Sequence, residues 1–152
     1  VEFQAKQRLL GREISWESLS VGGFPYRVEA AVGAVHFTAP DRGSAWDAER
    51  VVVHLPSLGL DRIGISLEGQ LHYFYAREQW IETNARADKA LFTFSTGEAG
   101  RQRLDVAIKQ LTGKAKLDAT DFNFIVDEAA GGIDIVAAGT RTIACRAITV
   151  TS

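Results

Sequence analysis

The stretch RQRLDVAIKQL, residues 101–111, alternates apolar and polar side chains with a period of two. Leu104, Val106 and Ile108 take every second position, and the positions between them are charged or small. Successive side chains of a β-strand point to opposite faces of a sheet, whereas the repeat of a helix is 3.6 residues. The pattern therefore predicts a strand that buries one face.

The same period recurs in two further segments. Their apolar sets are Tyr26, Val28, Ala30, Val32 and Ala34 in the first, and Phe122, Phe124 and Val126 in the second. Branched and aromatic residues, which favour strands, are also frequent at residues 49–55, 64–75, 89–95, 132–138 and 141–150. We expect roughly nine or ten strands with short connections, which favours an antiparallel meander.

Turn signals separate these segments. The sequences TGEAG (residues 96–100), DEAAGG (residues 127–132) and AGTR (residues 138–141) predict hairpin loops. Pro40 and Pro56 each follow a strand-like run. Because proline has no N–H to donate, we expect each of them to end strand pairing.

Helix is expected at the N-terminus. Residues 2–11 suit a short helix that ends at Gly11, since glycine is a favoured C-cap, and they equally suit the tail of a longer helix. Residues 76–90 have a helix-like composition, but their strand-like flanks favour strand or loop. The predicted fold is all-β: a curved antiparallel meander sheet or an open sandwich with a short N-terminal helix.

Length and charge limit the class of protein. The 152 residues suit one β-rich domain, 1–152. The net charge of −2 comes from well-mixed basic and acidic residues, which argues against a nucleic-acid groove or a polybasic membrane patch. The lone cysteine, Cys145, excludes a disulfide within the chain and a zinc site built on cysteines. Methionine is absent, so we expect a fragment of a longer protein or a processed form.

The sequence carries no motif for a reaction. His36, His54 and His72 are equally spaced, but zinc ligands come as a close pair with distant partners, so surface or locally satisfied histidines are expected. There is no phosphate-binding loop, no dinucleotide fingerprint and no nucleophile elbow. We therefore expect no catalytic residue, no metal and no cofactor, and a protein that is not an enzyme.

The aromatic side chains are the best candidates for binding. Stretches such as LHYFY (residues 71–75) put aromatic rings on both faces of a strand, which is expected where both faces are covered. Core packing is one reading of these rings, and an apolar groove for a lipid chain or a partner is the other. The residues predicted to bind such a ligand are Trp16, Phe24, Tyr26, Tyr73, Tyr75, Phe122 and Phe124.

One element resembles a known family. Gly23, Phe24, Pro25, Tyr26 and Arg27 are followed by a Trp-x-Ala segment at residues 46–48 that leads into a strand. This order resembles the domain-of-unknown-function family 2125 of bacterial, chiefly alphaproteobacterial, envelope proteins, and the likeness is best over residues 12–75. The resemblance implies an N-terminal anchor in the inner membrane and a β-rich part in the periplasm. It carries over no catalytic residues.

A looser likeness concerns the predicted architecture. Long meandering sheets with a concave apolar face are similar to the AsmA-like envelope proteins, which are implicated in moving lipids between membranes. The expected function is therefore that of a non-enzymatic periplasmic protein that binds a lipid or another apolar ligand in a sheet groove. Two alternatives stay open: a scaffolding domain that binds an envelope protein, and an envelope enzyme whose site lies partly outside this chain.

Overall fold

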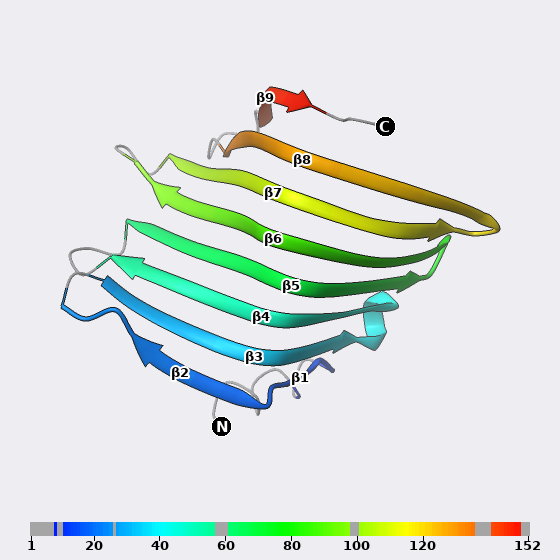
Figure 1. Ribbon diagram of the computed structural model, residues 1–152, viewed down its shortest axis with the longest axis horizontal. Coiled ribbons are helices and arrows are strands. Elements are labelled where there is room, and N and C mark those ends of the chain that lie inside the picture. The colour runs from blue at the N-terminus through cyan, green and yellow to red at the C-terminus, as the bar shows by residue number, and fades with distance from the viewer. Residues whose placement is uncertain are drawn as a thin grey trace.

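The chain forms one open antiparallel sheet (Figure 1). The computed structural model describes residues 8, 11–25, 27–56, 61–97, 101–135 and 141–149, with the backbone alone for residues 135 and 141–149. The strands are β1 (Glu13–Ser15), β2 (Ser18–Gly22), β3 (Arg27–Ala39), β4 (Ser44–Pro56), β5 (Arg62–Ala76), β6 (Trp80–Thr96), β7 (Gln102–Leu117), β8 (Thr120–Ile135) and β9 (Arg141–Thr149), with a short 3-10 helix, η1 (Pro40–Arg42), between β3 and β4.

The strands from β3 to β9 pair in chain order, each with the next. Both β1 and β2 pair with β3, β1 along its second half and β2 along its first. Figure 1 shows the bowed strands side by side in a single layer. The predicted curved antiparallel meander is thus confirmed, and within the described residues the strands form no second sheet of a sandwich.

Several local predictions can be compared with the strands. Residues 80–90 lie in β6, as the strand reading of residues 76–90 required, and the loop predicted at residues 96–100 separates β6 from β7. Pro40 begins η1, and Pro56 is the last residue of β4. The helix predicted at residues 2–11 and the turn at residues 138–141 lie largely outside the described residues.

The turn predicted at residues 127–132 is wrong, because β8 runs through it without a break. Gly132 serves packing rather than chain reversal. A Cβ on Gly132 would come within 2.5 Å of the Arg103 guanidinium and 2.6 Å of the Asp105 carboxylate. Glycine therefore makes room for the ion pairs that Arg103 forms with Asp105 and Asp134.

Side-chain direction changes along a line that crosses the sheet. We call this line the crease; the ladders skip or shift their register there, at Ala34, Glu49, Gly69, Asp88, Gln110 and Asp127. Ala34 and Gln110 have a φ of 50° and Gly69 a φ of 82°, all in the left-handed region. Such residues and β-bulges interrupt strict alternation.

The crease keeps apolar side chains on one side of the sheet. Leu67 pairs with Ala90, which pairs with Ile108, so these three share a face. Leu67 and Leu111 line the same cavity, although strict alternation would put Ile108 and Leu111 on opposite faces. The same reversal makes Val35, rather than the predicted Ala34, continue the apolar face of β3.

The two faces consequently differ in chemistry. On one face Leu104, Val106 and Ile108 continue the apolar rows of neighbouring strands, and we call it the apolar face. The opposite, polar face carries most of the charged side chains. Aromatic rings lie mostly on the apolar face, but the prediction for LHYFY is confirmed. Phe74 lies on the polar face, opposite to Tyr73 and Tyr75, and forms an edge-to-face pair with Trp80, with ring centroids 4.9 Å apart.

Few side chains are fully enclosed by this single layer. The buried apolar residues among those described are two valines and five alanines: Val35, Ala39, Ala48, Val52, Ala85, Ala87 and Ala90. Larger apolar side chains are partly or largely exposed, as Tyr73 and Phe94 are. Within the described residues, the apolar face is therefore an open surface rather than the inside of a core.

Candidate functional site

An aromatic row crosses the apolar face beyond the crease. Direct pairing across five ladders aligns Phe37, Trp46, Tyr73, Thr83, Ala115 and Phe122. Phe37 and Trp46 stack with their ring centroids 5.7 Å apart. Large rings at both ends of the row flank small side chains on β6 and β7, and this contrast in size shapes a trough.

The trough holds a cavity of about 310 Å³. We call it the aromatic groove; it is lined chiefly by Trp46, Leu67, Leu71, Tyr73, Thr83, Ala85, Leu111 and Phe124. Ligand pockets of proteins begin at about 300 Å³ and are mostly apolar. The groove is therefore large enough for a small apolar molecule or a segment of an acyl chain.

Small residues form the floor of the groove. Ala85 is only 6% exposed, and its partner on β7 is Gly113. A Cβ on Gly113 would lie 2.6 Å from the Asn84 carbonyl oxygen and 2.8 Å from the Cα of Ala85. The backbone of β6 cannot yield easily, so glycine is required opposite Ala85.

The predicted ligand-binding residues divide into two groups. Tyr73 and Phe124 line the groove, and Phe122 lies in the same row as Tyr73. Tyr73 is 41% exposed and Phe122 is 48% exposed, so both rings are accessible. Tyr75 shares the apolar face with Tyr73, two residues along β5, but does not line the cavity.

The other three candidates lie elsewhere. Trp16 lies between β1 and β2 at the edge of the sheet, and Phe24 lies before β3 with 85% of its surface exposed. Neither lines the aromatic groove. Tyr26 lies outside the described residues.

Trp46 lines the groove although it was not among the predicted ligand-binding residues. In the sequence it stands out only as part of the Trp-x-Ala segment that carries the family resemblance. The signal that could have found it is register: a β4–β5 hairpin places Trp46 directly opposite Tyr73. The pairing depends on the register shift at the crease, which the sequence pattern does not reveal.

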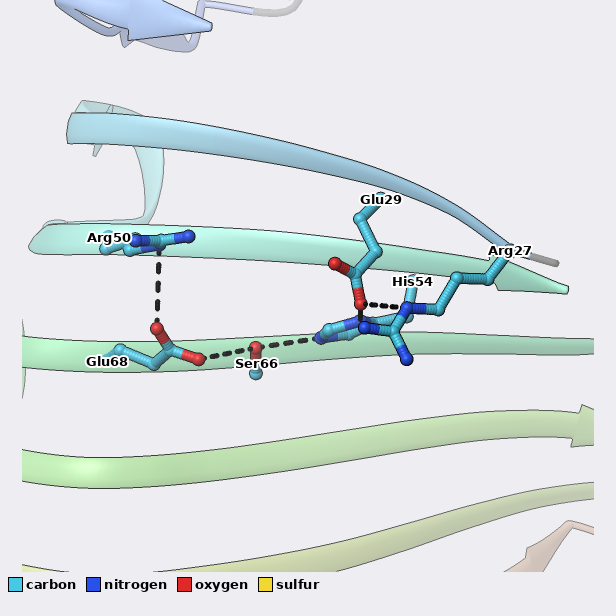
Figure 2. Close-up of polar contacts among 6 residues, drawn as sticks. All are labelled: Arg27, Glu29, Arg50, His54, Ser66 and Glu68. Atoms are coloured by element: carbon cyan, nitrogen blue, oxygen red, sulfur yellow. Dashed lines mark hydrogen bonds and ion pairs between the residues drawn. The ribbon is translucent and has the colours of Figure 1, made fainter. Parts of the chain in front are cut away.

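The polar face carries a chain of hydrogen bonds through His54 (Figure 2). The His54 Nδ1 atom lies 3.0 Å from Glu29 Oε1, and its Nε2 atom lies 3.0 Å from Ser66 Oγ. Glu29 also pairs with Arg27, and the Ser66 hydroxyl reaches Glu68, which pairs with Arg50.

The order carboxylate, imidazole and hydroxyl is also that of a serine-hydrolase triad. Ser66, however, has no exposed surface, so its hydroxyl cannot meet a substrate in this structure. These hydrogen bonds join three strands, because Glu29, His54 and Ser66 come from β3, β4 and β5.

A second polar cluster lies on the same face beyond the crease. Asp47 accepts hydrogen bonds from His36 and from His72, whose Nδ1 atom lies 3.2 Å from Asp47 Oδ2. Partial burial opposes charge on the Asp47 carboxyl, but the hydrogen bonds and positive charge of the two histidines outweigh it and hold its pKa below the usual 3.8. The Nε2 atom of His72 also lies 3.4 Å from Glu82 Oε1.

Comparison with known proteins decides the family. A family model described as an uncharacterized protein conserved in bacteria, domain-of-unknown-function family 2125, matches residues 1–145. The chain belongs to this family. The match to family 2125 covers far more of the chain than the residues 12–75 that carried the sequence resemblance. No curated protein and no solved structure matches the chain.

Two kinds of feature are absent from the described residues. No helix among them is both long and apolar enough to cross a membrane. No group of three or more histidine, cysteine, aspartate or glutamate side chains in the described ranges is arranged to hold a metal ion.

Proposed function

We propose that this member of family 2125 is a non-enzymatic protein of the bacterial cell envelope that binds a lipid chain or another apolar ligand. The observation that carries the proposal is the aromatic groove, an apolar cavity of about 310 Å³ on a face that no other described strand covers. Its walls include Trp46, Tyr73 and Phe124.

The apolar face is energetically costly when it is exposed to water. Each square ångström of apolar surface removed from water contributes about 25 cal/mol. Contiguous apolar patches larger than a few hundred square ångströms usually mark an interaction site. An apolar ligand in the groove would cover the exposed ring of Tyr73 and so reduce this cost.

The proposed setting is the periplasm, with attachment to the inner membrane through a segment outside this chain. Support comes from the envelope character of the family that the Gly-Phe-Pro element resembles. An apolar ligand is also abundant at a membrane, where acyl chains are the commonest apolar groups.

The experiment is a titration of the purified chain, freed of bound lipid, with the apolar fluorescent probe N-phenyl-1-naphthylamine. We expect saturable binding that Phe124→Ala weakens about tenfold, corresponding to about 1.4 kcal/mol. Phe94→Ala is the matched control, because Phe94 is an exposed ring on the apolar face outside the groove. Absence of saturable binding, or equal weakening by both variants, would contradict the proposal, and mass spectrometry of organic extracts would identify a natural ligand.

A scaffolding role is the second candidate, and the edge of the sheet favours it. β2 exposes Leu19 and Val21, and Phe24 follows close behind. An edge strand with exposed apolar side chains is a template for pairing with another chain. If Leu19→Lys and Val21→Lys abolish recovery of a defined partner while probe binding is unchanged, the scaffolding role is favoured over ligand binding.

A further inference from the structure

A second hollow lies on the polar face, near the end of the sheet that holds His54. Its volume is about 300 Å³. Its polar lining comes from Arg27, His54, Arg62, Lys89 and Thr93, and its apolar lining from Leu55, Pro56, Gly64 and Leu91. The residues come from four neighbouring strands, β3 to β6. The hollow is thus a feature of the sheet surface itself and not of a loop.

Glycine keeps the hollow open. Gly64 pairs with His54 on one side and with Thr93 on the other. A Cβ on Gly64 would lie 3.3 Å from the Cβ of His54 and 3.6 Å from Cδ1 of Leu91. Any larger side chain at position 64 would therefore occupy the space between these two walls.

The charge around the hollow is one-sided. Three of its lining residues, Arg27, Arg62 and Lys89, are cations, and among the residues that the structure describes no acidic side chain lines it. Asp105 lies directly opposite Thr93 and is paired with Arg103. The carboxylates of Glu29 and Glu68 on this face are also engaged, Glu29 by Arg27 and His54, and Glu68 by Arg50. Figure 2 shows both carboxylates turned toward these partners.

Arg62 and Lys89 contribute the unneutralised charge. Neither forms an ion pair with any other described residue. Lys89 is also placed directly opposite Lys109 on β7, and like charges in this position destabilise a sheet. An anion in the hollow would offset that repulsion.

The available donors match a phosphoryl group. A guanidinium can hold two oxygens of a phosphate at once, and a lysine ammonium acts as a point charge beside it. The Arg27 guanidinium uses its Nε atom for Glu29, 2.9 Å away, which leaves its terminal N–H groups for a ligand. The Thr93 hydroxyl adds a neutral donor, whereas both ring nitrogens of His54 are already bonded.

We propose that this hollow is an anion-binding site that takes a phosphoryl group, from a free phosphate compound or from the headgroup of an anionic phospholipid. It lies on the face opposite the aromatic groove, so it does not depend on the function proposed for that groove. Arg62 and Lys89 are its main ligand-binding residues, with Arg27 and Thr93 completing it.

The test uses the whole chain and two probes. Inorganic phosphate is titrated by calorimetry, and vesicles of phosphatidylcholine with or without phosphatidylglycerol are tested by cosedimentation. The test variant is the double substitution Arg62→Gln with Lys89→Gln, and the control is Lys114→Gln with Lys116→Gln, which removes two positive charges from β7 beyond the crease. All four side chains are exposed, so both variants should fold, which thermal melting checks.

We expect the test variant to bind its probe at least tenfold more weakly and the control variant to bind within twofold of the unchanged chain. Binding of inorganic phosphate would assign the site to free phosphate compounds, and binding to phosphatidylglycerol vesicles alone would assign it to headgroups. If neither probe binds, or if the control variant loses as much binding as the test variant, the proposal is overturned.

Discussion

The two faces of this sheet are built from the same strands, yet they are organised by different forces. On the apolar face, aromatic rings and branched side chains surround the aromatic groove. Their contacts are hydrophobic and have no preferred direction. The polar face is organised by directional contacts, such as the hydrogen bonds that His54 forms with Glu29 and Ser66. In a single layer neither face can be sealed by the other, so each is a surface that can meet a ligand.

The largest expected effect on stability follows a substitution on the apolar face, at the floor of the aromatic groove. Gly113→Val should destabilise the chain by about 3 kcal/mol, because a Cβ there would collide with the backbone of β6. Chemical denaturation measures the change in the free energy of unfolding. Gly131→Ala is the control, since a Cβ on Gly131 would meet nothing within 4 Å. Equal losses at the two glycines would mean that the close approach of β6 and β7 is not the cause.

The next largest effect on stability follows the removal of the buried Ser66 hydroxyl on the polar face. Ser66→Ala should cost about 1–3 kcal/mol, because the His54 ring and the Glu68 carboxylate each lose a partner. Urea denaturation measures it, with Ser20→Ala on the exposed strand β2 as the control. A loss no greater than that of Ser20→Ala would show that the chain of hydrogen bonds does not join the strands.

A smaller effect depends on pH. The pKa of Asp47 is lowered in the folded chain, so its carboxylate contributes stability that is present above its unfolded value of 3.8 and is lost as the pH falls through the folded pKa. Asp47 is partly exposed, so the contribution should be below about 1 kcal/mol. The difference in unfolding free energy between the unchanged chain and Asp47→Asn should be fully present above pH 3.8 and shrink as the pH falls below it. A difference that grows on acidification would contradict this sign.

The smallest effect is expected at Phe24, near the edge of the sheet, and it is compared with a ring inside the sheet. Phe24 is 85% exposed, so Phe24→Ala should change the free energy of unfolding by less than about 0.5 kcal/mol. Thermal melting measures it against Phe92→Ala, a partly buried ring on β6, which should cost more. If the two losses are alike, Phe24 packs against a part of the chain outside the described residues.

Much of the fold could be predicted because period two is a local property of the chain. The alternation of Leu104, Val106 and Ile108 locates β7 and its apolar face without any tertiary information. The crease could not be predicted, since nothing in the sequence marks Gln110 as a residue with a positive φ. For that reason the reversal of faces at Ala34 was missed.

The site was predicted in part, for a related reason. Tyr73 and Phe124 stand out as strand aromatics, and each lines the groove. Their neighbour Trp46 depends on a register shift between β4 and β5, which is a property of two strands together. The preference of the second hollow for anions arises from Arg62 and Lys89. These residues are 27 positions apart in the sequence and are brought together only by the β5–β6 pairing.

The crease has a consequence for how the sheet opens. Where the ladders skip, at positions such as Ala34 and Gln110, backbone amides lack the regular cross-strand bonds that protect their neighbours. Hydrogen exchange should therefore be fast along a line perpendicular to the strands, between two slowly exchanging panels. The aromatic groove lies mainly on one panel and the cationic hollow on the other. Each panel can thus loosen or tighten around its own ligand while the other halves of the same strands stay paired.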